Sequence, residues 1–136
     1  MTKQDKNTLV IGAFLMALSI GFGAFGAHGL KNLVSAASLE TFEIGVRYQM
    51  VHSLAIVIMG LARVIPPSVK KWTVRCFVVG MLFFSGSLYL LTFQTVWNAD
   101  LSALGPVTPV GGLLLITGWA YLGIRLLTMN RDNSPG

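Results

Sequence analysis

The residues of this sequence best suited to chemistry lie within ten positions of one another. Glu43 and Arg47 are four residues apart, and Tyr48 and His52 repeat that spacing one step later, with Gln49 between them. Residues four apart on a helix share a face, so Glu43 can pair with Arg47 and Tyr48 lies beside His52. A carboxylate, a guanidinium, a phenol, an amide and an imidazole could together bind a polar ligand or transfer a proton.

Other interpretations of the polar residues have less support. His28 and His52 could ligate a haem, but no attachment motif and no third histidine accompany them. A zinc site would need three or four ligands, and His28, His52, Glu43 and Asp100 are scattered along the chain. Residues 21–26 (GFGAFG) match a dinucleotide-binding spacing, but that motif works only between a strand and a helix. We therefore expect no cofactor and no metal.

The composition of the chain indicates a membrane protein. Of the 136 residues, 54% are hydrophobic and only 11% are charged, whereas soluble domains carry about 25% charged residues. A soluble fold of this size could not cover so much apolar surface, so the excess faces lipid. The ten Lys and Arg lie mostly beside apolar segments and form no long basic run or stripe, which excludes a typical nucleic-acid-binding protein.

Four apolar segments are long enough to cross a hydrocarbon core of about 30 Å. They cover residues 8–27, 44–65, 73–93 and 107–128. We expect Ser38 to cap the second helix, with Glu40 in its first turn, and Pro66 and Pro67 to form the turn into the third. The sequence thus predicts one all-α domain, an integral membrane four-helix bundle, followed by a flexible tail over 129–136.

The basic residues predict the orientation of this bundle. Lys31 and Arg47 flank the spans on one side, and eight Lys and Arg flank them on the other, namely Lys3, Lys6, Arg63, Lys70, Lys71, Arg75, Arg125 and Arg131. Flanks rich in Lys and Arg stay in the cytoplasm. We therefore expect cytoplasmic N and C termini and a multi-pass protein of the cell inner membrane.

A cleaved signal peptide is the alternative for the first apolar segment. Lys3 and Lys6 precede it, and small residues end it at Ala27. The segment is long for a signal peptide, and its removal would leave three spans with basic flanks on opposite sides. We therefore expect it to remain as the first span.

Small residues predict where the helices pack, because small side chains let helices approach closely in lipid. We expect three such contact regions, one each in the first, third and fourth spans. They are Ala13, Ala17 and Gly21, then Ser85, Gly86 and Ser87, and finally Gly111 and Gly112.

The predicted second span places the residues suited to chemistry between the outer boundary of the membrane and its interior. Arg47 lies near the outer boundary, and His52 lies about 7–8 Å deeper at 1.5 Å per residue. Ionisable groups at the bilayer centre cost about 2.5–3.5 kcal/mol on insertion scales, which favours a functional role. The structural alternative is that Glu43 and Arg47 neutralise each other and that the histidines are packed and hydrogen-bonded. The complete candidate set, hereafter the polar cluster, is His28, Glu43, Arg47, Tyr48, Gln49, His52 and Tyr89.

Four motifs in order resemble a known family. They are residues 23–31 (GAFGAHGLK), 42–49 (FEIGVRYQ), 84–89 (FSGSLY) and 104–112 (LGPVTPVGG). Together they resemble the YgdD-like family, domain of unknown function 423, which includes the eukaryotic transmembrane protein 256. The resemblance covers nearly all of the chain and implies a small inner-membrane protein with several spans. It implies no particular activity and no catalytic residues.

Three functions remain as hypotheses. We favour a structural or accessory membrane protein, without enzymatic activity, that packs in the lipid bilayer with itself or with another membrane protein. The second hypothesis is a small transporter, channel or lipid-binding protein that uses the polar cluster. The third is a membrane-embedded enzyme with His28 or His52 as its acid–base group, which only the residue types favour.

Overall fold

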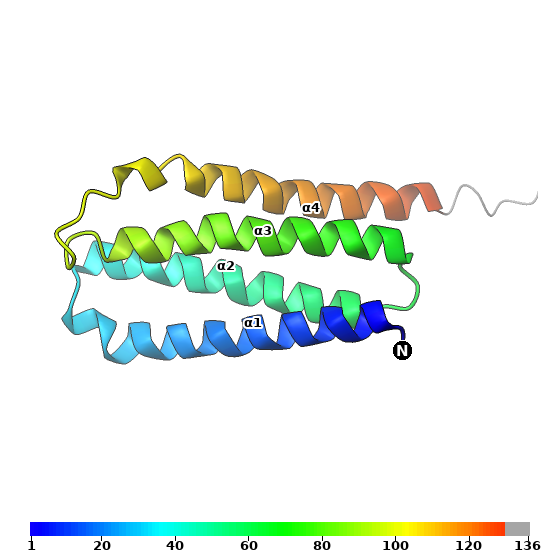
Figure 1. Ribbon diagram of the computed structural model, residues 1–136, viewed down its shortest axis with the longest axis horizontal. Helices are drawn as coiled ribbons and strands as arrows, with labels where there is room; N and C mark the ends of the chain where they lie inside the picture. Colours follow the sequence, from blue (N-terminus) through cyan, green and yellow to red (C-terminus); the bar gives the residue numbers. More distant parts are fainter. Residues whose placement is uncertain (130–136) are drawn as a thin grey trace, which may run out of the picture.

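The computed structural model describes residues 1–129, which form four long helices without any strand (Figure 1). The elements are α1 (Lys3–His28), η1 (Leu30–Asn32), α2 (Ala36–Leu61), α3 (Pro67–Thr92), η2 (Ser102–Leu104) and α4 (Val107–Met129). All four long helices have the length and apolar composition needed to cross a membrane. The predicted all-helical membrane fold is confirmed. The predicted flexible tail lies outside the described residues, except for Met129 at the end of α4.

Local sequence signals explain where the helices begin. Thr2 caps α1, because its hydroxyl accepts a hydrogen bond from the backbone N–H of Asp5 at 3.1 Å. Ser35 caps α2 and accepts from the N–H of Ser38 at 3.2 Å. The prediction of Ser38 as the cap is therefore wrong. Ser35 follows η1 after Leu33 and Val34 and has the extended backbone that a cap requires, so the helix begins before Ser38. Pro67 occupies the first turn of α3, where it needs no N–H partner.

The helices lie side by side in chain order, with α1 and α4 at opposite edges of the view in Figure 1. Helix contacts are most extensive between α1 and α2, α2 and α3, and α3 and α4. The start of α1, the α2–α3 turn and the end of α4 lie together at one end, which we call the basic end. The turns η1 and η2 lie at the other end, which we call the loop end (Figure 1). Arg131, one of the eight basic residues counted above, lies outside the described residues.

Two apolar clusters form the core. The larger one includes Ile56, Phe77 and Leu115 and joins α2, α3 and α4. The smaller one contains Leu30 and Phe42, with several aromatic rings packed around it near the loop end. The bundle is therefore packed through most of its length, and the polar side chains at depth must fit between these clusters.

Glycines bring the helix backbones close together. A Cβ added at Gly12 would lie 2.9 Å from the backbone nitrogen of Val57, and one at Gly111 would collide with the backbone of Phe84. Gly111 is thus a contact point between α3 and α4, and the neighbouring Gly112 lies against the Phe84 ring. Gly12 and Gly111 admit no larger side chain without a shift of a neighbouring helix.

The small residues expected to form a packing face on the first span are not on the buried face of α1. Ala13, Ala17 and Gly21 lie on the exposed side of α1, and a Cβ added at Gly21 would meet nothing within 4 Å. The buried face of α1 carries Thr8, Gly12, Ser19 and Gly26 instead. Each residue along a helix is rotated by about 100° from the one before it. Gly12 therefore faces α2, while its neighbour Ala13 lies on the exposed side.

Candidate functional site

The side chain of Gln49 links three helices near the middle of the bundle. It is only 4% exposed. Its Nε2 donates a hydrogen bond to the backbone carbonyl of Leu15 in α1 at 3.0 Å, and its Oε1 accepts one from the Tyr89 hydroxyl in α3 at 2.8 Å. The amide is therefore satisfied at both ends, as a buried polar group in lipid must be.

His52 lies less than one turn beyond Gln49 in α2, and its side chain forms a hydrogen bond with α4. Its Nδ1 lies 2.7 Å from the carbonyl oxygen of Tyr48, and its Nε2 lies 3.1 Å from the indole Nε1 of Trp119. A carbonyl only accepts and an indole N–H only donates, so Nδ1 carries the proton and Nε2 accepts. This assigns His52 as a neutral imidazole with both nitrogens occupied. It has no lone pair left for a haem or a metal.

Aromatic rings enclose this histidine. The Tyr48 ring lies 4.4 Å from that of Phe84, and the Phe77 ring lies 5.1 Å from His52 and 4.9 Å from Trp119, measured between centroids. Trp119 therefore packs between helices and closes the α4 side of the imidazole. Edge and tilted arrangements of such rings stabilise packing beyond their buried area.

The small residues of α3 point in three directions. The Ser85 hydroxyl donates to the backbone carbonyl of Gly45 in α2 at 2.7 Å. Ser87 lies on the α4 side, where its hydroxyl is 2.6 Å from that of Thr108. Gly86 lines an apolar groove between α1 and α3, and a Cβ added to it would meet nothing within 4 Å. Two of the three residues therefore contact neighbouring helices, and the third leaves space open.

The charged members of the polar cluster do not join this interior. His28, Glu43 and Arg47 are exposed. The ion pair expected between Glu43 and Arg47 is absent, since the one salt bridge within residues 1–129 joins Asp5 to Lys70. An exposed pair gains at most about 1 kcal/mol, which does not offset the ordering of two long side chains. The seven predicted residues therefore form two separate internal contacts and an exposed remainder, not one site.

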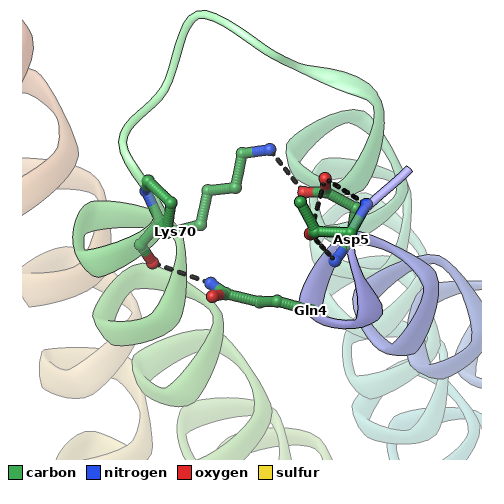
Figure 2. Close-up of polar contacts among 5 residues, drawn as sticks. Gln4, Asp5 and Lys70 are labelled. Carbon is green, nitrogen blue, oxygen red and sulfur yellow. Dashed lines mark hydrogen bonds and ion pairs between the residues drawn. The ribbon is translucent and has the colours of Figure 1, made fainter.

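Sequence reasoning missed the polar contacts at the basic end. Figure 2 shows Lys70 reaching from α3 to Asp5 in α1, where Nζ and Oδ1 are 2.7 Å apart. The side chain of Gln4 donates to the backbone carbonyl of Pro67 at 2.7 Å. The Thr2–Asp5 spacing signals a helix cap, but nothing local in the sequence pairs Asp5 with a residue 65 positions away.

Asp100 stays in the exposed loop before η2, away from the internal contacts. The hydroxyl and the backbone N–H of Ser102 stabilise its carboxylate and lower its pKa below the usual 3.8. Asp100 is therefore a turn-forming carboxylate. Among residues 1–129, no three His, Cys, Asp or Glu side chains come close enough to hold a metal ion together.

Comparisons with known proteins connect this arrangement to a family. The model of the family described as "Protein of unknown function (DUF423)" matches residues 22–112, which include all of α2 and α3. The chain belongs to the DUF423 family. It is 39% identical to a UPF0382 membrane protein of Staphylococcus haemolyticus, over 86% of this chain and 92% of that protein.

The similarity extends beyond one group of bacteria. The chain is 35% identical to a UPF0382 membrane protein of Haemophilus influenzae, over 88% of this chain and 91% of the relative. It is 37% identical to one of Schizosaccharomyces pombe, over 82% of this chain and 94% of the relative. No solved structure matches the chain. The chain is thus a polytopic membrane protein of a family whose biochemical activity is unassigned.

Proposed function

We propose that this DUF423 chain is a structural or accessory membrane protein that associates in the bilayer with a second copy of itself or with another membrane protein. The observation that carries the proposal is that its deep polar side chains are already hydrogen-bonded to other residues of the bundle. The Gln49 amide bonds to α1 and α3, and both nitrogens of the His52 ring are occupied. Groups held in this way stabilise a bundle, whereas a transport path or a catalytic site needs polar groups that a substrate can reach.

The exposed side of α1 supports the association. Ala13, Ala17 and Gly21 lie there at spacings of four residues, on one face of the helix. Small residues at this spacing allow close backbone approach between helices in lipid. The larger exposed side chains Phe14 and Leu18 flank this face and could pack beside an approaching helix.

Disulfide crosslinking in membranes tests this proposal. Ala17→Cys in a Cys76→Ala background places the only thiol of the chain on the proposed face. Ile116→Cys in the same background is the matched control, because it lies on the exposed side of α4 about as far from the basic end. After oxidation we expect a dimer, or a discrete adduct with another membrane protein, for Ala17→Cys only. Equal crosslinking at both positions, or none at position 17, contradicts the proposal.

We also propose that both ends of the chain lie in the cytoplasm and that the membrane is the inner one. The gathering of basic residues at the basic end supports this orientation, since such residues stay on the cytoplasmic side. Fusions of green fluorescent protein and of alkaline phosphatase after residue 130 test it. We expect fluorescence without phosphatase activity, and an active phosphatase contradicts the orientation.

A further inference from the structure

A crevice of about 540 Å³ opens between α1 and α3 at the basic end. Three exposed cationic side chains, Lys3, Lys71 and Arg75, line it together with the polar residues Gln4, Asn7 and Thr8. Lys71 and Arg75 are four residues apart and share one face of α3. The Arg75 guanidinium also lies 5.1 Å from the ring centre of Trp72, an exposed aromatic side chain of the kind found at membrane interfaces.

No acidic side chain in the described part of the chain forms an ion pair with the cations of this crevice. Within residues 1–129, Asp5 is the one acidic residue at the basic end, and it bonds to Lys70 (Figure 2). Asp5 and Lys70 do not line the crevice. Lys3, Lys71 and Arg75 therefore present positive charge that fits an anionic group from outside the chain.

An apolar groove of about 260 Å³ continues along the same two helices toward the loop end. On α1 the lining passes from Ile11 in the crevice to Leu15 and Leu18 in the groove, and on α3 from Val74 to Val78. These steps of three or four residues keep one face of each helix on the groove. The α3 lining then reaches Gly86, whose missing side chain leaves space in the groove.

The distance from the crevice to Gly86 in the groove suits one leaflet of a bilayer. Val74 and Gly86 are twelve residues apart, which corresponds to about 18 Å along a helix. Half of a hydrocarbon core measures about 15 Å. A chain that starts at the basic mouth can thus follow the groove through its own leaflet.

We propose that this α1–α3 surface binds an anionic phospholipid. Its phosphate lies among Lys3, Lys71 and Arg75, and one acyl chain follows the groove past Gly86. A second groove between α2 and α4 is lined by apolar and aromatic residues such as Leu54, without any charged side chain in its lining. The crevice that gathers three exposed cations lies on the α1–α3 side, so we expect selection of the lipid by headgroup charge there. This inference does not rest on the proposed association through Ala17, although Leu18 belongs to both surfaces.

Native mass spectrometry of the full chain in detergent tests the headgroup contact. The probes are palmitoyl-oleoyl phosphatidylglycerol and, as the zwitterionic comparison, palmitoyl-oleoyl phosphatidylcholine. The K3Q/K71Q/R75Q variant removes three exposed cations from the crevice, and K31Q/R47Q/R125Q removes three exposed cations from elsewhere. Each cation that contacts the headgroup contributes roughly fivefold in affinity, so we expect the first variant to lose about a hundredfold in phosphatidylglycerol affinity. We expect the second variant to lose little. Equal losses in both variants, or none in the first, overturn the proposal.

The acyl-chain contact needs a separate test that leaves the charge unchanged. Gly86→Leu fills the groove, and Gly123→Leu adds the same side chain on α4 where a Cβ likewise meets nothing within 4 Å. We expect Gly86→Leu to weaken phosphatidylglycerol binding by roughly fivefold and Gly123→Leu to leave it unchanged. Glycerol 3-phosphate, which has the phosphate but no chains, should not displace the lipid at equal concentration. Displacement by glycerol 3-phosphate, or equal behaviour of the two leucine variants, overturns the proposal.

Discussion

The interior of the bundle and its basic end use polar residues in opposite ways. In the interior, Gln49 and His52 are neutral, and each bonds to two fixed partners. At the basic end one ion pair joins α1 to α3, while three neighbouring cations face an open crevice. Distance from water accounts for the difference, because unsatisfied polar groups are costly in hydrocarbon and tolerable at an interface.

This comparison shows which residues hold the fold and which remain available to a partner. Interior polar groups must find partners within the protein, and one buried atom, the hydroxyl of Thr73, is the exception among the described side chains. Exposed charges at the interface, such as Lys71 and Arg75, carry no such requirement. We therefore expect substitutions in the interior to change the free energy of unfolding, and substitutions at the basic end to change binding more than folding.

The largest effect is expected where backbones touch. Gly111→Leu forces a side chain against the backbone of Phe84, so we expect a loss of about 3 kcal/mol in the free energy of unfolding. Unfolding in mixed detergent and SDS micelles measures it. Gly123→Leu, in open space on the same helix, is the control and should be close to neutral. Similar losses in both variants would show that α4 does not depend on this close contact.

The next largest effect concerns the imidazole between α2 and α4. His52→Ala leaves the Trp119 N–H without its partner and opens a cavity, so we expect a loss of about 2 kcal/mol. His28→Ala, at an exposed position, is the control. Combining His52→Ala with Trp119→Phe should destabilise the protein by less than the sum of the single changes. An additive result would contradict the hydrogen bond between the two rings.

A smaller effect is expected at the third helix of the interior network. Tyr89→Phe removes the hydroxyl that donates to Gln49, and single hydrogen bonds of this kind contribute about 0.6 kcal/mol within membranes. The same unfolding assay measures the change. Tyr121→Phe is the control, since its hydroxyl makes no hydrogen bond among residues 1–129. A loss for Tyr121→Phe as large as for Tyr89→Phe would remove the case for the network.

The smallest effect on folding is expected at the basic end. Asp5→Asn removes the charge but keeps a side-chain oxygen that can accept from the Lys70 ammonium, whose side chain is 4% exposed. We therefore expect the thermal midpoint to fall by at most a few degrees, and by less at high salt. Differential scanning fluorimetry in detergent at two salt concentrations measures this. Glu40→Gln, an exposed residue near the loop end, should show no change. A fall larger than that of His52→Ala would reverse the ranking of the two regions.

Much of the fold could be predicted from local features, but the candidate site could not. Spans of the right length and the proline turn at Pro67 identify the helices. The position of Gln49 beside Leu15 and Tyr89 depends on contacts between residues 34 and 40 positions apart. The Glu43–Arg47 spacing is favourable for a pair, yet the pair does not form, because spacing on a helix permits a contact without making it stable.

The sequence by itself determined that this protein has four membrane-spanning helices, because long apolar segments must satisfy their backbone hydrogen bonds within lipid. It also determined that basic residues gather at one end of the bundle. Only the tertiary structure decided which face of α1 packs against α2 and that the Trp119 indole donates a hydrogen bond to His52. It also decided that Lys3 of α1 lines the same crevice as Lys71 and Arg75 of α3. These outcomes depend on the rotation of each helix about its axis, which packing between distant segments sets and local spacing does not.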